Sequence, residues 1–262
     1  MSCTRTVGEL KTWLDAGLGF FYPPACQICG QERAHVGDGY VCGDCWSRDG
    51  GLRFIVPPFC ERCGLPHEGA ITTTYACANC CDMDLQFRTA RAAVTARGLA
   101  LEIIHRYKYQ RALWFEPFLA QLLLRQALPW LQGSPWNVLV PVPLHPVKER
   151  EREFNQARRL ALRLGAGASL PVECRALVRK TPTRTQTALS REERTRNVRR
   201  AFAVQDPARV RGAHVVLVDD VMTTGATASA CAAALREAGA VEVCVWTVAR
   251  AVFEPDLSSL SA

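Results

Sequence analysis

The chain has 262 residues, of which 48% are hydrophobic and 22% are charged, as in a globular protein with a sizeable core. We therefore expect one large domain or two small ones, and the composition argues against a disordered or fibrous chain. No run of 18 apolar residues occurs, so we expect no stable membrane insertion. The first 22 residues lack an apolar segment with a small-residue cleavage site, so we expect no signal peptide and a cytoplasmic location.

Residues 1–22 carry apolar side chains at helical spacing, at Leu10, Trp13, Leu14 and Leu18. This spacing predicts a short amphipathic helix that packs against the region that follows. The segment is not basic, which gives a role at a membrane surface little support.

Eight of the 13 cysteines form four Cys-x-x-Cys pairs before residue 81, and these pairs belong to an internal repeat. The pattern Pro-x-Cys-x-x-Cys-Gly begins at Pro24 and again at Pro58, and each copy is followed by a further Cys-x-x-Cys pair. Each unit therefore supplies four thiolates, the number that a closed tetrahedral zinc site needs. We predict two structural zinc ions, bound by Cys26, Cys29, Cys42 and Cys45 and by Cys60, Cys63, Cys77 and Cys80.

Other interpretations of these cysteines remain open. An interleaved arrangement of the four Cys-x-x-Cys pairs also gives two sites of four thiolates, and Cys81 is able to replace Cys80. Redox-active dithiols are a further interpretation, although they leave the repeat unexplained. Since a closed site has no open coordination position, we expect the metal to fold a module with little core of its own.

Apolar residues at helical spacing predict helices across residues 86–130, with Leu99 and Ile103 on one buried face. In this region Lys108 lies between Tyr107 and Tyr109. Such a lysine either contacts a phosphate beside a stacked base or lies along a helix end with its charge in water. The sequence leaves both possibilities open.

An apolar run from Val138 to Pro143 predicts a buried strand that leads into a loop. A basic run follows at residues 148–152, then a helix to about Leu164 and a short strand at residues 177–180. Between residues 145 and 200 there are 15 of the 32 basic side chains but only six of the 25 acidic ones. This excess suits a polyanion such as pyrophosphate or a nucleic-acid backbone, and a solvated arginine-rich face is the alternative.

Residues 215–218 are four consecutive apolar residues, which are typical of a buried strand in a parallel sheet. Asp219 and Asp220 follow, at the end of the strand where α/β sheets bind their ligands. The next residues form a loop rich in threonine that leads into a helix from Ala226 to about Ala238. Backbone amides, hydroxyls and the helix amino end together favour a phosphate, and the two carboxylates suit the hydroxyls of a sugar.

The string VLVDDVMTTGAT at residues 216–227 resembles the PRPP-binding motif of type I phosphoribosyltransferases. The resemblance implies that Asp219 and Asp220 hold the ribose hydroxyls. It implies that the 5-phosphate is bound by Thr223, Thr224, Gly225, Ala226 and Thr227. One alternative is a buried strand followed by a capped helix, which leaves Asp219 and Asp220 unexplained. Another is a Walker B strand, but the sequence contains no Walker A motif.

The strings PVPLHP and REFNQA are similar to the signature of the ComF (competence protein F) family, and so are the order of the Cys-x-x-Cys pairs and the stretch at residues 181–197. One departure is Glu153, where the family usually has glycine. The resemblance implies a pyrophosphate loop and a mobile hood that include Pro143, Arg152, Asn155, Gln156, Gln186, Arg191 and Arg194.

The resemblance also implies an α/β fold, in which a double zinc ribbon over residues 23–85 precedes a phosphoribosyltransferase-like domain over residues 86–252 and a tail over residues 253–262. This domain would contain a mostly parallel sheet with helices on both faces. The implied function is DNA uptake in natural transformation, with a PRPP-type site, imported single-stranded DNA and other DNA-uptake proteins as partners. The alternative is an active phosphoribosyltransferase, in which a nitrogen nucleophile attacks C1 of PRPP with Mg²⁺ and releases pyrophosphate. No residue in the sequence stands out as a general base. The reaction does not require one, because stabilisation of the leaving pyrophosphate can supply most of the catalysis.

Overall fold

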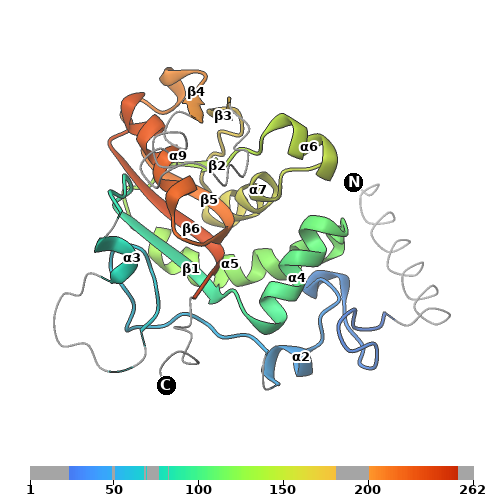
Figure 1. Ribbon diagram of the computed structural model, residues 1–262. Helices are drawn as coiled ribbons and strands as arrows, with labels where there is room; N and C mark the ends of the chain where they lie inside the picture. Colours follow the sequence, from blue (N-terminus) through green and yellow to red (C-terminus); the bar gives the residue numbers. More distant parts are fainter. Residues whose placement is uncertain are drawn as a thin grey trace, which may run out of the picture.

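A four-stranded sheet forms the centre of the computed structural model, which describes residues 24–48, 51–67, 69, 77–81, 83–180 and 201–252 (Figure 1). The strand order is β1-β6-β5-β2, and every pair of neighbours is parallel. The strands are β1 (Thr89–Thr95), β2 (Val138–Pro141), β5 (His214–Met222) and β6 (Glu242–Arg250).

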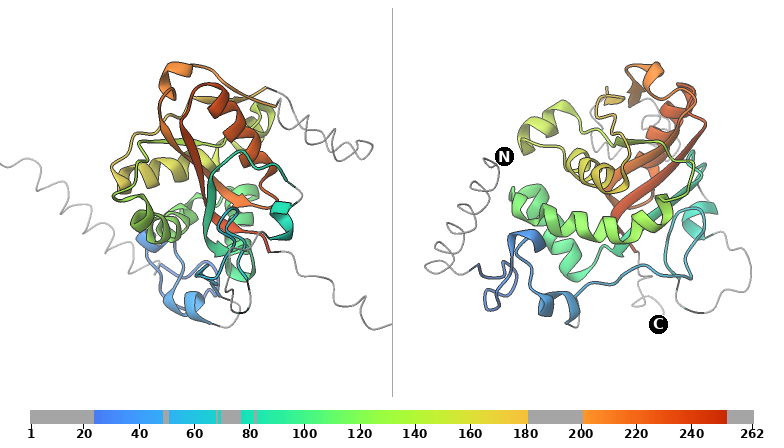
Figure 2. Two further views of the ribbon diagram at one scale, coloured as in Figure 1. Left: turned by 90° about the vertical axis from the view of Figure 1, so that its left-hand side faces the viewer. Right: turned by 180° about the vertical axis from the view of Figure 1, so that it is seen from behind.

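Helices cover both faces of this sheet, as the two further views show (Figure 2). One group of helices packs in a core with the first cysteine unit, and α9 packs with the second unit in another core on the other side. The longer helices are α4 (Gly98–Tyr109), α5 (Glu116–Leu131), α6 (Pro146–Arg152), α7 (Gln156–Ala168) and α9 (Ala226–Glu237). The predicted mostly parallel sheet with helices on both faces is confirmed.

Short elements surround this centre. A two-stranded antiparallel sheet pairs β3 (Leu177–Arg179) with β4 (Phe202–Val204). The remaining short helices are η1 (Val36–Asp38), α2 (Gly43–Ser47), α3 (Ala78–Cys81), η2 (Leu113–Phe115) and η3 (Pro207–Arg209). No helix among the described residues has both the length and the apolar character needed to cross a membrane.

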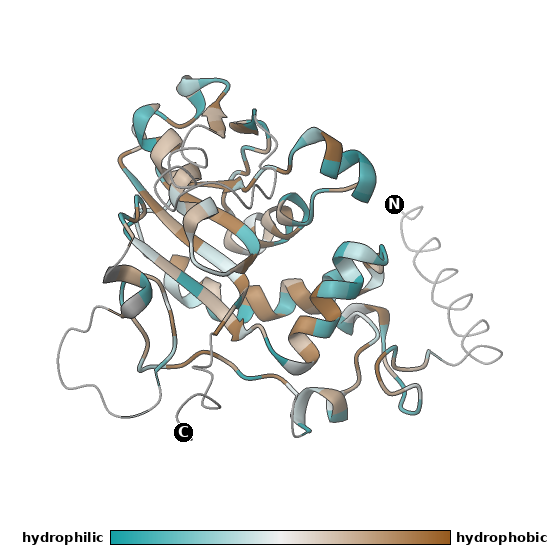
Figure 3. Ribbon diagram, viewed as in Figure 1, coloured by the Kyte–Doolittle hydropathy of each residue, from teal (hydrophilic) through white to brown (hydrophobic). Residues whose placement is uncertain are grey.

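Hydrophobicity follows the layers of the fold. Residues 215–218 of β5 are all completely buried, because helices cover this strand on both faces. Figure 3 shows mainly hydrophobic residues along β5 and α5, whereas α6 is mostly hydrophilic. The basic run at residues 148–152 therefore lies on a helix that stands at the surface.

The prediction of helices throughout residues 86–130 is wrong at its start, where β1 forms an edge strand. The middle of this strand, residues 90–93 (ARAA), contains none of the branched residues that favour strands. The strand forms because it pairs with β6, from Thr89 opposite Cys244 to Thr95 opposite Arg250. Tertiary pairing therefore decides the structure of this segment.

Some of the predictions concern residues that the structure does not describe. The predicted helix over residues 1–22 and the predicted tail over residues 253–262 lie outside the described residues. The same holds for three predicted hood residues, which are Gln186, Arg191 and Arg194.

Candidate functional site

Asp219 and Asp220 lie inside β5, because this strand continues to Met222 and is longer than predicted. The extension follows from β6, which is equally long and pairs Met222 with Arg250. Successive residues of a strand point to opposite faces. The two carboxylates therefore have different surroundings.

Asp219 shares a cavity of about 70 Å³ with the residues that follow β5. We call residues 223–227 the phosphate loop. Gly225 lies at the junction of loop and helix with a φ of 91°, a left-handed conformation that favours glycine. Since α9 begins at Ala226, its first amide groups have no partner within the helix. The structure thus brings the carboxylate together with all five predicted phosphate-loop residues, Thr223, Thr224, Gly225, Ala226 and Thr227.

Asp220 is buried and forms an ion pair with Lys108, whose Nζ lies 2.7 Å from Oδ2. The other carboxylate oxygen accepts a hydrogen bond from the Val221 amide at 2.8 Å. Lys108 comes from the last turn of α4, and the set of predicted site residues does not include it. The sequence contains no signal for this contact, because it joins residues 112 positions apart.

Burial and the neighbouring Asp220 carboxylate raise the pKa of Asp219 well above its usual range, although Lys108 acts in the opposite direction. The Asp219 Oδ1 atom accepts a hydrogen bond from the Asp220 amide at 2.8 Å. A buried acid and a half-buried acid beside one lysine favour a ligand that brings hydroxyl donors or a metal ion.

A second cavity, of about 210 Å³, lies beside the loop that follows β2. Pro143, Asn155 and Arg158 line it from one side, and Arg179 lines it from β3. Burial lowers the pKa of Arg179, and the Asp219 carboxylate acts in the opposite direction. An arginine of the second cavity therefore lies within electrostatic range of the first cavity.

The predicted pyrophosphate residues Asn155, Gln156 and Arg152 also make contacts within the protein. Asn155 caps α7, where its Oδ1 accepts from the Arg158 amide at 3.1 Å and its Nδ2 donates to the Val142 carbonyl at 3.1 Å. Gln156 is buried at the start of the same helix. The Arg152 guanidinium lies 5.0 Å from the centre of the Tyr109 ring.

The backbone conformation at Glu153 is one that favours glycine, the residue that the ComF family usually has at this position. The residue ends α6 with a φ of 66°, in the left-handed region that glycine adopts most readily. Its carboxylate lies 2.7 Å from Nη1 of Arg111, so this ion pair balances the charge that replaces the glycine.

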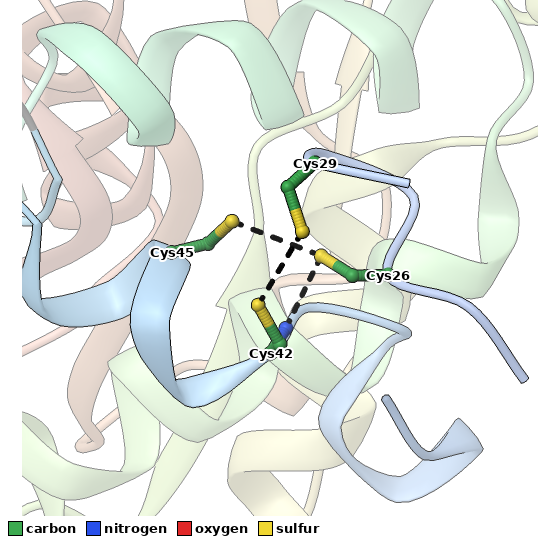
Figure 4. Close-up of side chains that lie close together, drawn as sticks. All are labelled: Cys26, Cys29, Cys42 and Cys45. Atoms are coloured by element: carbon green, nitrogen blue, oxygen red, sulfur yellow. Dashed lines mark hydrogen bonds between the residues drawn. The ribbon is translucent and has the colours of Figure 1, made fainter. Parts of the chain in front are cut away.

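The eight predicted cysteines form two groups of four, in sequential order. We call residues 24–48, which contain Cys26, Cys29, Cys42 and Cys45, the first ribbon. Residues 58–81, which contain Cys60, Cys63, Cys77 and Cys80, are the second ribbon. In the first ribbon the four sulfur atoms converge on one point (Figure 4). Cys26 and Cys45 sulfurs lie 3.8 Å apart, and those of Cys29 and Cys42 lie 3.7 Å apart.

The second ribbon has similar geometry. Its sulfurs lie 3.7 Å apart between Cys60 and Cys80 and 3.3 Å apart between Cys63 and Cys77. A tetrahedron with zinc–sulfur bonds of about 2.3 Å has edges of about 3.8 Å. Both groups therefore fit a structural zinc ion, and their separations are too long for disulfides.

Comparison with known proteins finds models of both kinds of domain in the chain. The model of the double zinc ribbon domain matches residues 17–81, and that of the phosphoribosyl transferase domain matches residues 157–253. Competence protein F of Haemophilus influenzae is 34% identical over 157 residues, which are 57% of this chain and 67% of that protein. The chain belongs to the ComF (competence protein F) family.

Further ComF relatives include the DNA utilization protein YhgH of Salmonella typhimurium and of Escherichia coli K12. Each is 34% identical over 151 residues, which are 56% of this chain and 66% of the relative. The matched part of this chain thus spans about two thirds of the length of its ComF relatives.

Two solved structures match 48% of this chain and 24% of their own. They are a glutamine phosphoribosylpyrophosphate amidotransferase from B. subtilis, at 25% identity, and an allosteric regulatory enzyme of purine biosynthesis, at 27% identity. Both give a TM-score of 0.34, so the likeness adds nothing to the ComF assignment.

Proposed function

We propose that this protein acts in DNA uptake, where it handles imported single-stranded DNA in the cytoplasm and binds PRPP or a similar phosphoribosyl ligand. The observation that carries the proposal is the cavity that joins Asp219 to the phosphate loop. The names of its relatives, competence protein F and DNA utilization protein, support the role in DNA uptake. Other DNA-uptake proteins are its expected partners.

In this proposal the phosphate loop binds the 5-phosphate through its amides and hydroxyls, and the positive end of the α9 dipole adds to the attraction. Asp219 accepts hydrogen bonds from the ribose hydroxyls. Asp220 either joins it or keeps Lys108 in place. Mg²⁺ accompanies the pyrophosphate, because this ion usually binds through phosphates and one or two carboxylates. Two zinc ions bind the first and second ribbons and stabilise their folds.

Calorimetric titration of PRPP with Mg²⁺ tests this site. The wild type is expected to bind, whereas the double variant Asp219→Asn/Asp220→Asn is expected to lose binding. Glu102→Gln serves as the control, since this carboxylate lies on α4 and pairs with Arg106. A well-folded, zinc-loaded wild type that does not bind PRPP would contradict the proposal.

The proposed contact with single-stranded DNA lies around Tyr109. This ring is 62% exposed, the Arg152 guanidinium lies 5.0 Å from its centre, and the His105 ring lies 4.8 Å away. Tyr107 does not share this role, because it is completely buried against Phe154. An exposed aromatic ring beside arginine is a platform on which a base stacks without sequence preference.

Binding of a labelled oligodeoxythymidine at several salt concentrations tests this surface. Affinity is expected to fall steeply with salt, and Tyr109→Ala is expected to weaken binding by about 1–3 kcal/mol. Trp130→Ala is a matched control, because Trp130 is also half exposed and also has an arginine, Arg91, over its ring. Equal losses in both variants, or a flat salt dependence, would argue against this surface.

An active phosphoribosyltransferase is the second candidate function, and the lining of the second cavity favours it. Two residues predicted for the pyrophosphate loop, Pro143 and Asn155, line this cavity together with Arg179, a basic side chain that suits the pyrophosphate that leaves. The test is release of pyrophosphate from PRPP and Mg²⁺ with a panel of nitrogen bases. Release that depends on both the base and Asp219 would establish turnover, and its absence in a protein that binds PRPP would leave a binding role.

A further inference from the structure

The carbonyl groups at the end of β5 and at the start of the phosphate loop accept hydrogen bonds from Arg250 of β6 and from Asn79 of the second ribbon. Arg250 donates hydrogen bonds from Nη1 to the carbonyls of Met222, at 3.2 Å, and of Thr223. Asn79, which lies between the cysteines Cys77 and Cys80, donates from Nδ2 to the Thr224 carbonyl at 3.1 Å. Three consecutive carbonyls therefore have fixed donors.

Arg250 also contacts the second ribbon directly. Its Nε donates to the Cys63 carbonyl at 3.2 Å, and its Nη2 lies 3.8 Å from the Cys63 sulfur. The side chain is completely buried, and its partners among the described residues are carbonyl oxygens and this sulfur. A buried guanidinium needs compensating negative charge, and a zinc ion with four thiolates carries a formal charge of −2. A zinc-bound second ribbon supplies that charge.

Residues 84–87, which follow the second ribbon, contact the phosphate loop and the start of α9. A Cβ at Gly225 would lie 3.6 Å from the side chains of Leu85 and Phe87. In the first turn of α9, the Ser229 hydroxyl accepts from the Gln86 amide at 3.0 Å and donates to the Asp84 carbonyl at 3.2 Å. The loop and the helix start are thus both attached to this segment.

The first ribbon provides an internal comparison. Arg106 of α4 donates to the Gln27 carbonyl at 2.8 Å, and Gln121 of α5 donates to the Gly37 carbonyl at 2.7 Å. Within the part of the chain that the structure describes, the first ribbon makes no hydrogen bond to the phosphate loop. An arginine thus holds each ribbon, but only one of the two arginines also holds the loop.

We propose that the second ribbon is a structural part of the ligand site and that Arg250 and Asn79 are positioning residues of the phosphate loop. Zinc in the second ribbon and a phosphoribosyl ligand then stabilise each other, while zinc in the first ribbon is independent of the ligand. This inference rests on the proposed PRPP site. Because coupling between two binding sites is reciprocal, the ligand raises the affinity for zinc by the same factor by which zinc raises the affinity for the ligand. If the gain in zinc affinity comes from slower dissociation of zinc, the ligand slows zinc release by that factor.

Zinc release from the full-length, zinc-loaded protein to a chromogenic chelator tests the coupling, with and without PRPP and Mg²⁺. Alkylation of the released cysteines and peptide mass spectrometry assign each ion to its ribbon. We expect PRPP to slow release from the second ribbon by on the order of 5- to 150-fold and to leave the first ribbon unchanged. Equal rates with and without bound PRPP would overturn the inference.

Variants separate the two contacts. Arg250→Met and Asn79→Ala are expected to reduce the effect of PRPP on the second ribbon, and Asn79→Ala does so without removing a buried charge. Arg106→Met is the matched control, since it removes an arginine–carbonyl contact from the first ribbon only. The inference is wrong if Arg106→Met reduces the effect as much as the other two.

Hydrogen exchange of residues 222–229 distinguishes failure of this inference from failure of the proposed function. We expect Asn79→Ala to accelerate exchange of these amides without any ligand. If PRPP does not bind but exchange accelerates, the proposed function fails and the positioning role stands. If PRPP binds while exchange and zinc release stay as in the wild type, the proposed function stands and the inference fails.

Discussion

The two ribbons share a cysteine pattern but differ in what holds them. Gly30 and Gly64 occupy equivalent positions and have φ angles of 70° and 66°. A Cβ at Gly30 would meet nothing within 4 Å, whereas at Gly64 it would lie 2.6 Å from the Ala90 carbonyl oxygen of β1. The second ribbon is therefore packed tightly onto the edge of the sheet.

The first ribbon packs on helices instead. The rings of Trp46 and Phe118 meet edge to face with centres 4.9 Å apart, and Gly39 lies close to the α5 backbone. The contacts of the first ribbon are with helices, whereas the second ribbon contacts the phosphate loop through Asn79 and contacts Arg250 of β6. The comparison shows that duplication of a four-cysteine unit does not duplicate its contacts, because different residues surround each copy.

Loss of one zinc ion is the strongest way to break this comparison. We expect Cys63→Ser to abolish zinc binding in the second ribbon and to weaken PRPP binding by on the order of 5- to 150-fold. Cys29→Ser is expected to abolish zinc binding in the first ribbon and to leave PRPP affinity unchanged. Metal analysis should find one zinc per chain in each variant, and calorimetry should find weakened PRPP binding only in Cys63→Ser. Wild-type PRPP affinity in a one-zinc Cys63→Ser protein would mean that the two ribbons do not differ in their effect on the site.

Arg250→Met is expected to lower the free energy of unfolding by about 4 kcal/mol, because it leaves several buried carbonyls without donors. Arg106→Met is expected to cost below about 1 kcal/mol, since the Arg106 side chain is partly exposed and its ion pair lies at the surface. Urea unfolding of the zinc-loaded proteins measures both values. Equal losses would remove the distinction between the two arginines.

Lys108 tests the ion pair that joins α4 to Asp220 of the site. Lys108→Met leaves the buried Asp220 carboxylate without its partner, and we expect a loss of about 3 kcal/mol in the free energy of unfolding. The double variant Lys108→Met/Asp220→Asn should recover most of this loss, as a double-mutant cycle in urea would show. Additive losses would indicate that the pair contributes no coupling energy.

The two glycines allow a smaller and closely matched comparison. Gly64→Ala is expected to lower stability by about 2 kcal/mol more than Gly30→Ala, because both positions carry the same backbone strain but only Gly64 lacks room for a Cβ. Melting temperatures of the two zinc-loaded variants measure the difference. The same melting temperature for both would mean that β1 shifts away from the added Cβ with no loss of stability.

The smallest expected effect concerns pH. The raised pKa of Asp219 means that the folded protein holds a proton more firmly than the unfolded chain does. The stability that comes from Asp219 is therefore fully present below the usual aspartate pKa of about 3.9 and is lost as pH rises through the raised value. Asp219→Asn should remove this dependence, so its melting temperature should gain on the wild type as pH increases. A constant difference across pH would mean that the pKa of Asp219 is not raised.

Much of the fold follows from short sequence patterns. The apolar run at residues 215–218 predicts the central strand, and the small residues after Met222 predict the loop and the start of α9, because these signals are local. The edge strand β1 is missed because TARAAVT has no strand pattern of its own and depends on β6. The length of β5 is missed for the same reason.

The sequence by itself determined the four Cys-x-x-Cys pairs, the family and the motif at residues 216–227, because each depends on the identity and spacing of residues close together in the chain. Only the tertiary structure decided the partners of these motifs. Lys108 reaches Asp220 across 112 residues, and Arg250 reaches Cys63 across 187. Contacts between distant residues arise from the packing of strands and helices, and no local pattern in the chain records them.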